Sequence, residues 1–240
     1  MIISLCSAKG GVSRSTGSLG LAGALARAFR TAVVDLDADA YSTEMGLAQS
    51  PCDDPLNAPP ITFTHPRIRE GNLILFRGGD ALDRASDTEI ASHIERARCA
   101  ADIVVIDTPP DRRRPTVTMA MAAADVVVIP VLPEFQAVSG LERILCTMAE
   151  MRLNAPVRAL LSRWEAQTRL ARDVQLELLA QHPGLVVPIA VPRDQRAAEA
   201  PAAGVPVTLL APRSRAATAY STAVYDIAAS AGLRIPKGAI

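Results

Sequence analysis

The sequence predicts a doubly wound α/β fold, in which helices cover both faces of a mostly parallel sheet. Short runs of Val and Ile at 103–106 and 126–129 are apolar at consecutive positions, which is typical of strands buried on both faces. Such runs alternate along the chain with segments of helical apolar spacing, and this alternation favours parallel strands joined by helical crossovers. The chain of 240 residues has no composition break and no internal repeat, so we expect one domain over residues 1–240.

The first part of the chain has the pattern strand, loop, helix, strand. Residues 2–6 are a short apolar run, and the glycine-containing stretch 8–13 follows it. Leu and Phe residues then recur at helical spacing over 19–29, and 32–36 is a second apolar run with a carboxylate near its end. We therefore expect two buried strands joined by a loop and a helix.

The middle of the chain continues the alternation after a long loop. The Pro-rich stretch 50–66 predicts a loop that contains no helix or strand. Apolar runs predict strands at 73–76, 103–107 and 126–130. Helical spacing predicts a helix over 87–99 and an Ala- and Met-rich helix before the last of these strands.

The C-terminal part predicts five further elements and a tail. The elements are a helix at 136–152, a strand at 157–161, a helix at 168–181, a strand at 185–189 and a final helix near 214–231. We expect residues 233–240 to form a loose tail.

The charge balance limits the kinds of partner that the chain can bind. The 25 basic and 25 acidic residues cancel, so the whole surface is not a polycation for nucleic acid or anionic lipid. Residues 1–150 hold 14 basic and 19 acidic residues, whereas residues 151–240 hold 11 and 6. A surface for an anionic polymer is therefore expected mainly in the C-terminal part.

Cysteines, histidines and apolar runs indicate a cytoplasmic protein. The four cysteines form no CxxC pair and the three histidines are scattered, which fits reduced thiols better than a disulfide framework or a metal site. The N-terminus lacks the basic segment of a signal peptide, and no run approaches the roughly 18 apolar residues of a membrane-spanning helix.

The stretch 9–16 has the position and composition of a phosphate-binding loop. It lies between a predicted strand and a predicted helix, where backbone N–H groups and the helix N-terminus attract anions. Its glycines let the backbone approach phosphates, and the Ser15 hydroxyl is placed to bind the magnesium ion of a nucleoside triphosphate. Against the strict pattern GxxxxGK[ST], however, only Ser15 matches.

Carboxylates follow two neighbouring predicted strands. Asp35 and Asp37 come at the end of the second strand, and Asp107 ends the strand at 103–107. Because ligands of open α/β sheets bind beyond the carboxyl ends of the strands, we expect these carboxylates and the glycine loop to share one crevice. Magnesium-assisted hydrolysis needs such groups to position the ion and to orient water.

The loop sequence KGGVSRST resembles the deviant phosphate loop KGGxGK[ST][ST] of the ParA/MinD family of P-loop ATPases. Ser13 and Arg14 depart from that pattern. VVDLDADA is similar to the family's switch segment and VVIDTPP to its Walker B strand. VVVIPVLPEFQAVSGLERIL is similar to the stretch before the dimer-facing helix, and VVPIAVPRDQRAAEAPAAGVPV to the late EAxxxGxPV segment. The likeness covers residues 2–228, and ParA-type partition proteins are the most similar group.

The resemblance implies a P-loop NTPase fold of the deviant Walker A type that binds ATP and forms a homodimer with ATP bound. Lys9, one of only two lysines beside 23 arginines, is implied as a catalytic residue that reaches the partner's nucleotide. Asp37 is implied as the catalytic carboxylate that holds or activates water. Mg²⁺ is the implied cofactor, bound by Ser15 and, through water, by Asp35 and Asp107. The implied nucleotide-binding residues are Lys9, Gly10, Gly11, Val12, Ser13, Arg14, Ser15, Thr16, Ser162, Arg163, Pro192 and Arg193.

Several positions leave alternatives open. Arg14 replaces the usual P-loop lysine, so either it pairs with the β- and γ-phosphate oxygens and hydrolysis is slow, or the pocket is distorted and nucleotide binds poorly. Ser13 has a Cβ where glycine is usual, which predicts backbone strain. Asp39, where the family has Gln, either supports a ligand or is solvated. Ser162 replaces the family's Asn at the base, so ATP is expected by default and the preference for adenine over guanine stays open.

The resemblance also implies binding to double-stranded DNA without sequence preference. Arginines with no aromatic residues between them would contact phosphates rather than stack on bases, although the same arginines also fit an ordinary solvated surface. The implied DNA-binding residues are Arg169, Arg172, Arg193, Arg196, Arg213 and Arg215. A ParB-like or other adaptor protein is the implied partner that stimulates hydrolysis and so moves a plasmid, chromosome or other cargo over the nucleoid.

Three competing functions follow from the same fold class. A membrane-positioning ATPase needs a C-terminal amphipathic helix, and the segment 231–237 is too short and is broken by proline. An iron–sulfur carrier needs cysteines soon after the Walker B strand, and 111–125 contains none. A nucleotide-binding adaptor that hydrolyses weakly or not at all stays open, because Ser13 and Arg14 also fit a degenerate site.

Overall fold

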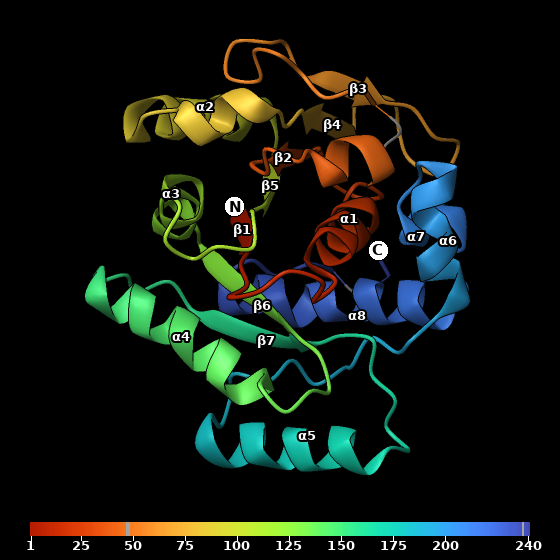
Figure 1. Cartoon of the computed structure of the whole chain (residues 1–240). Coiled ribbons are helices and arrows are strands. Elements are labelled where there is room, and N and C mark those ends of the chain that lie inside the picture. Colours follow the sequence, from red (N-terminus) through yellow and green to blue (C-terminus); the bar gives the residue numbers. More distant parts are fainter. Residues whose placement is uncertain (47–48, 237) are drawn as a thin grey trace.

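The computed structural model describes residues 1–46, 49–236 and 238–240, and over these ranges seven strands form one sheet in the order β3-β4-β2-β5-β1-β6-β7 (Figure 1). Every neighbouring pair is parallel except β3 and β4, which are antiparallel. The predicted doubly wound, mostly parallel sheet is confirmed. The strands are β1 (Ile2–Leu5), β2 (Thr31–Asp35), β3 (Ile61–Phe63), β4 (Leu73–Phe76), β5 (Ile103–Asp107), β6 (Val126–Val131) and β7 (Val157–Leu161).

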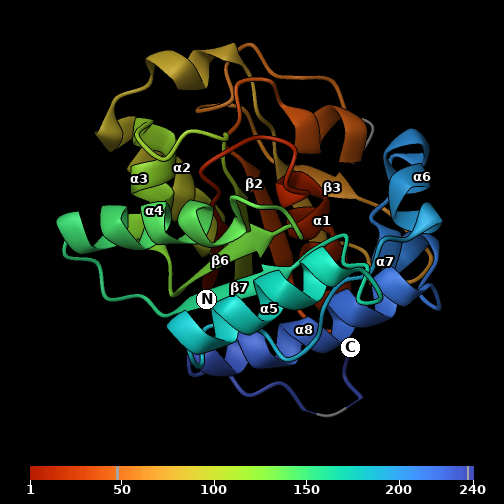
Figure 2. The ribbon, with the colours of Figure 1, turned by 60° about the horizontal axis from the view of Figure 1, so that its bottom comes forward.

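Helices cover both faces of the sheet (Figures 1 and 2). One face packs on α1 and α8 and the other on α2, α3, α4 and α5. In β5, Ile103 and Val105 face the first layer, whereas Val104 and Ile106 face the second, which explains why residues 103–106 are apolar at consecutive positions. The helices are α1 (Arg14–Leu25), α2 (Asp87–Ala100), α3 (Pro115–Ala123), α4 (Ala137–Glu150), α5 (Arg169–Gln181), α6 (Gln195–Ala203), α7 (Val207–Leu210) and α8 (Arg215–Ser230). Two short turns, Ser42–Gly46 and Asp80–Arg84, complete the elements.

The predicted strand at 185–189 is wrong. The Ala159 N–H donates to the Leu185 carbonyl, and the Val187 N–H donates to the Ala159 carbonyl, so the segment lies beside β7 for a single bridge. Pro188 follows at once and has no N–H with which to extend a ladder. The segment therefore touches the sheet without forming a strand.

The stretch 50–66 is also not a pure loop, because its end forms β3 on the edge of the sheet. Ile61 and Phe63 are half-buried and Thr62 is exposed, which is the alternation of an edge strand. The helices α6 and α7 were not expected either. Within the expected tail, Ile235 is buried against the α1–α8 layer.

No helix among the described residues is at once long and apolar enough to cross a lipid bilayer.

Glycine allows the close packing of α1 on α8. A Cβ on Gly20 would lie 2.6 Å from Cδ2 of Tyr220, whose ring is fully buried. We expect Gly20→Ala to lower the free energy of unfolding by about 1–3 kcal/mol in urea denaturation, because the buried ring cannot move aside. Gly140→Ala in α4 is the matched control, since its Cβ would meet nothing within 4 Å. It should raise stability by about 0.5–1 kcal/mol, and equal effects of the two substitutions would contradict this account.

His93 is expected to contribute a loss of stability in mild acid. Burial, together with the charge of Arg96, lowers the pKa of His93 from 6.5 to about 4. The unfolded chain therefore takes up a proton between pH 6.5 and 4 that the folded chain does not, so stability is present above pH 6.5 and is lost as pH falls towards 4. The loss should reach roughly 3 kcal/mol. In urea denaturation at a series of pH values, His93→Leu should lack this loss, and parallel curves for the two proteins would refute the assignment.

Candidate functional site

The carboxyl ends of β1, β2 and β5 meet at one edge of the sheet, where a cavity of about 390 Å³ opens. The phosphate loop, the segment after β2 and the segment after β5 all contribute to its walls. This arrangement brings together most of the residues expected at the phosphates. The lining residues are Gly10, Gly11, Ser13, Arg14, Ser15, Thr16, Asp37, Asp39, Tyr41, Pro110 and Arg163.

The backbone of the loop is left-handed at two positions. Gly11 has φ 75° and Ser13, the N-cap of α1, has φ 64°. The predicted strain at Ser13 is confirmed, because a residue with a Cβ rarely adopts this region. The loop then passes directly into α1, whose N-terminus points its free N–H groups at the cavity.

Lys9 does not line this cavity. Its Nζ forms an ion pair with Glu134, which follows β6, and both side chains are half-exposed. Lys9 and Val12 instead line a neighbouring hollow beside the start of α4. The ammonium is therefore accessible at the surface and turned away from the phosphate loop of its own chain.

Arg14 is buried among side chains from three strand ends. Its Nη1 donates to Oγ of Ser7 at 3.0 Å, its Nη2 to Oδ2 of Asp37 at 3.2 Å and its Nε to Oδ1 of Asp107 at 3.3 Å. Arg14 is 8% exposed. One guanidinium thus joins the phosphate loop to the carboxylates at the ends of β2 and β5.

Asp35 and Asp107 lie behind the cavity and do not line it. Asp35 accepts hydrogen bonds from the Thr43 N–H and hydroxyl, and Asp107 accepts from the hydroxyls of Ser18 and Ser42. Burial, and then the charge of Asp107, raises the pKa of Asp35 to about 7. Ser18, Ser42 and Thr43 were not identified from the sequence, since a hydroxyl that supports a carboxylate has no fixed spacing.

The donors that face the cavity fit a hydrated magnesium ion. Ser15, Asp37 and Asp39 line it together, and magnesium is usually held by one or two such groups, by water and by substrate phosphates. Over the described ranges, no cluster of three or more His, Cys, Asp or Glu side chains is arranged to hold a metal alone. A role for Asp35 and Asp107 through bound water stays a prediction.

The residues expected at the base are dispersed. Arg163 lines the cavity with φ 50°, whereas the buried Ser162 donates to the Leu160 carbonyl. Pro192 forms a backbone bridge with Trp164, and Arg193 pairs with Glu165 at 3.1 Å. Of these residues, only Arg163 lines the phosphate cavity.

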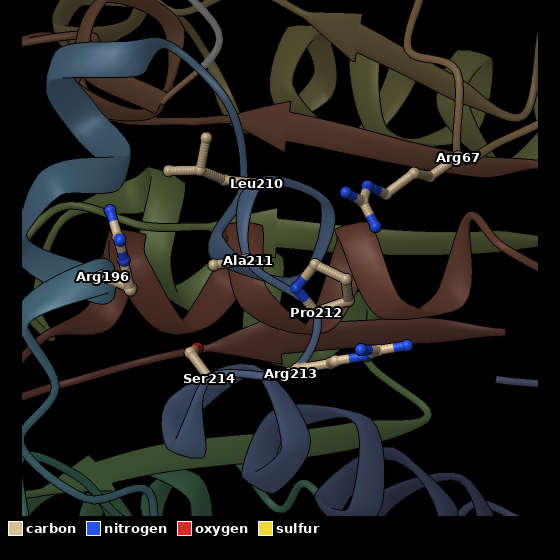
Figure 3. A pocket seen from close by; sticks show the side chains of 7 residues that line it. All are labelled: Arg67, Arg196, Leu210, Ala211, Pro212, Arg213 and Ser214. Carbon is tan, nitrogen blue, oxygen red and sulfur yellow. The ribbon is translucent and has the colours of Figure 1, made fainter.

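The expected DNA-binding arginines divide into separate groups. Arg196 and Arg213 line a second cavity of about 510 Å³, together with Arg67, which the sequence did not single out. In Figure 3, Arg67 and Arg213 lie on one side of the Leu210–Ser214 segment and Arg196 on the other.

The other expected arginines lie outside this cavity. Arg169 and Arg172 belong to α5, where Arg169 pairs with Asp173, and Arg215 donates to the Arg193 carbonyl. Arg196 pairs with Glu199, whereas no ion pair involves Arg67 or Arg213 within the described part of the chain.

The sequence of the chain matches a known protein family. Residues 3–207 match the model of the CobQ/CobB/MinD/ParA nucleotide binding domain. The chain is 32% identical over 245 residues to the chromosome-partitioning ATPase Soj of Thermus thermophilus, with 95% of each chain covered.

Solved structures show the same fold at lower identity. A putative plasmid partition protein of Borrelia burgdorferi bound to AMPPNP superposes with a TM-score of 0.77 at 19% identity, covering 94% of this chain and 97% of that one. Cobyrinic acid a,c-diamide synthase of Mycobacterium smegmatis, with bound ATP analogue and magnesium, superposes with a TM-score of 0.74 at 20% identity and covers 98% of each chain. At these identities the likeness establishes the fold alone, because this fold serves more than one reaction.

Proposed function

The chain belongs to the CobQ/CobB/MinD/ParA nucleotide-binding domain family, and from that premise we propose that it is a ParA-like partition ATPase. ATP closes a homodimer, the dimer binds double-stranded DNA without sequence preference, and a ParB-like or other adaptor protein stimulates hydrolysis and release. The same cycle moves a plasmid, a chromosome or another cargo over the nucleoid in the cytoplasm.

The phosphate-loop cavity is the observation that supports this proposal. It combines a glycine loop at the N-terminus of α1 with the hydroxyl of Ser15 and the carboxylate of Asp37. Backbone N–H groups at a helix N-terminus bind phosphate oxygens, and phosphoryl transfer depends mainly on such positioning and on charge neutralisation. A phosphate site and a candidate base therefore share one cavity.

In the proposed hydrolysis, different residues of the chain bind the phosphates, accept the proton of water and bind magnesium. The loop N–H groups hold the phosphate chain, and Asp37 orients a water and takes its proton as the water oxygen bonds to the γ-phosphorus and ADP leaves. Burial raises the pKa of Asp37, which makes it a stronger base than an exposed carboxylate. Ser15 would hold magnesium, with Asp35 and Asp107 acting through bound water, and the ion would supply charge neutralisation at the phosphate oxygens.

Nucleotide binding and dimerisation are tested together. Calorimetric titration with magnesium and ATP should give saturable heat, and light scattering with a non-hydrolysable ATP analogue should give the mass of a dimer. Absence of heat with ATP or GTP, in a chain that stays monomeric at every concentration, would overturn the proposal. A chain that binds ATP and dimerises without turnover would instead be the weakly hydrolysing or non-hydrolysing adaptor.

A separate prediction concerns DNA binding by the cavity that Arg67, Arg196 and Arg213 line. The double variant Arg196→Glu with Arg213→Glu should weaken binding to duplexes of unrelated sequence. It should also lower the slope of log affinity against log salt by about 0.9 for each lost phosphate contact. Fluorescence anisotropy at several salt concentrations, with ATP and magnesium present, measures both effects.

The control for that experiment is Arg98→Glu with Arg30→Glu, which changes the net charge equally in the N-terminal half. Arg98 lies on α2 and pairs with Glu95, and neither Arg98 nor Arg30 lines the cavity. If both double variants lose the same affinity, net charge rather than this cavity governs DNA binding.

A further inference from the structure

Arg14 is a departure of this chain from the phosphate loop of its family, and its contacts suggest what the departure does. The guanidinium donates in three directions, to Ser7, Asp37 and Asp107, at 3.0, 3.2 and 3.3 Å. An ammonium carries its three N–H donors on one nitrogen, whereas the planar guanidinium donates from separate nitrogens in a fixed fork. The network in this chain uses all three guanidinium nitrogens, one for each acceptor.

Arg14 also belongs to the wall of the phosphate cavity. Asp37 lines the same cavity. A nucleotide that enters brings anionic oxygens to the side chain that already neutralises Asp37 and Asp107. The phosphates and the two carboxylates thus compete for one cation.

Burial makes that competition strong. Arg14 is 8% exposed and Asp107 0%, and a buried charge that loses its partner is strongly disfavoured. Asp107 also accepts hydrogen bonds from Ser18 and Ser42, so it retains partners when Arg14 moves. Asp37 has one further hydrogen bond, from the Asp39 N–H, and is the carboxylate whose environment changes most.

We propose that Arg14 is a positioning residue that forms an ion pair with Asp37 in the nucleotide-free chain. When a triphosphate binds, the guanidinium pairs with the phosphate oxygens instead of with Asp37. This exchange of partners frees the Asp37 carboxylate to orient water only when a triphosphate is present. Asp37 thus acts as a built-in competitor of nucleotide binding. This inference rests on the proposed function, because it assumes that a nucleotide binds in this cavity.

The test compares two carboxylates of the same cavity. Asp37→Asn removes an acceptor of Arg14, whereas Asp39→Asn removes an equal charge from a lining residue to which Arg14 makes no bond. Both variants lose repulsion towards phosphate, but only the first releases the guanidinium. In calorimetry with a non-hydrolysable ATP analogue in EDTA, we expect Asp37→Asn to bind roughly tenfold more tightly than Asp39→Asn.

A second background isolates the role of Arg14. In Arg14→Gln, which removes the charge, the two aspartate substitutions should have equal effects on affinity. Ser7→Ala removes the acceptor of Nη1 and also the hydroxyl that donates to the Lys9 carbonyl, so its effect on affinity is compared between the wild-type and Arg14→Gln backgrounds. It should tighten binding, by a smaller factor than Asp37→Asn, only where Arg14 is present. It serves where Asp37→Asn does not fold, as judged by its thermal unfolding.

The outcomes separate the two levels of the proposal. If Asp37→Asn and Asp39→Asn bind the analogue equally, or Ser7→Ala changes the affinity equally with and without Arg14, the competition by Arg14 is refuted while nucleotide binding stands. If no variant gives heat with the analogue, with or without magnesium, the nucleotide site itself is refuted.

Discussion

Lys9→Ala is expected to lower the rate of ATP hydrolysis by roughly 10³–10⁵-fold, the range for a cation supplied by a partner molecule in phosphoryl transfer. The prediction rests on where the side chain lies. Lys9 belongs to the phosphate loop by sequence, yet its Nζ pairs with Glu134 and it does not line the cavity of its own chain. An ammonium at the surface beside the nucleotide site can serve a second copy of the chain. Phosphate release at saturating ATP and magnesium, with DNA present, measures the loss.

Two variants act as controls for this loss. Lys9→Arg keeps the charge but replaces a compact donor with a planar fork, so it should recover little of the rate. Glu134→Gln removes the partner of Lys9 within the chain and should leave hydrolysis within a few-fold of the wild type, since the lysine itself remains. A Lys9→Ala protein that retains half of the wild-type rate would show that the ammonium takes no part in the reaction.

The sheet could be predicted from the sequence because burial on both faces leaves a clear signal. The runs at 103–106 and 126–129 are apolar at every position, and each lies in a central strand. The edge of the sheet was less predictable. β3 is three residues long at the end of a Pro-rich stretch, and Val186 makes only a bridge before Pro188. At an edge, pairing depends on tertiary contacts more than on local pattern.

The site could be predicted as a set of backbone positions, but not as a set of side-chain contacts. The glycine loop, Asp37 and Asp107 lie at the expected strand ends. The sequence did not indicate that Arg14 bonds both of these carboxylates, or that the Thr43 N–H donates to Asp35. Such contacts are formed by residues 8 to 93 positions apart, and no local spacing rule describes them.

Asp37→Ala is expected to reduce ATP hydrolysis by roughly 10²–10⁴-fold, because it removes the group that orients water and takes its proton. The matched control is Asp39→Ala, which deletes a carboxylate from the same cavity wall and should cost far less. Phosphate release under the conditions used for Lys9 measures both. Equal turnover by wild type and Asp37→Ala would leave only the adaptor function, in which nucleotide is bound but not consumed.

Mixing the two inactive proteins tests both residues at once. In a mixed dimer, the Lys9→Ala chain keeps its own Asp37 and receives an ammonium from its Asp37→Ala partner, so one of the two sites is complete. An equal mixture forms mixed dimers in about half of the pairs, and activity should therefore recover to about a quarter of the wild-type rate. If Lys9 acted on the nucleotide of its own chain, neither site of the mixed dimer would be complete. The mixture would then stay as inactive as its components, which would exclude a lysine acting across the dimer.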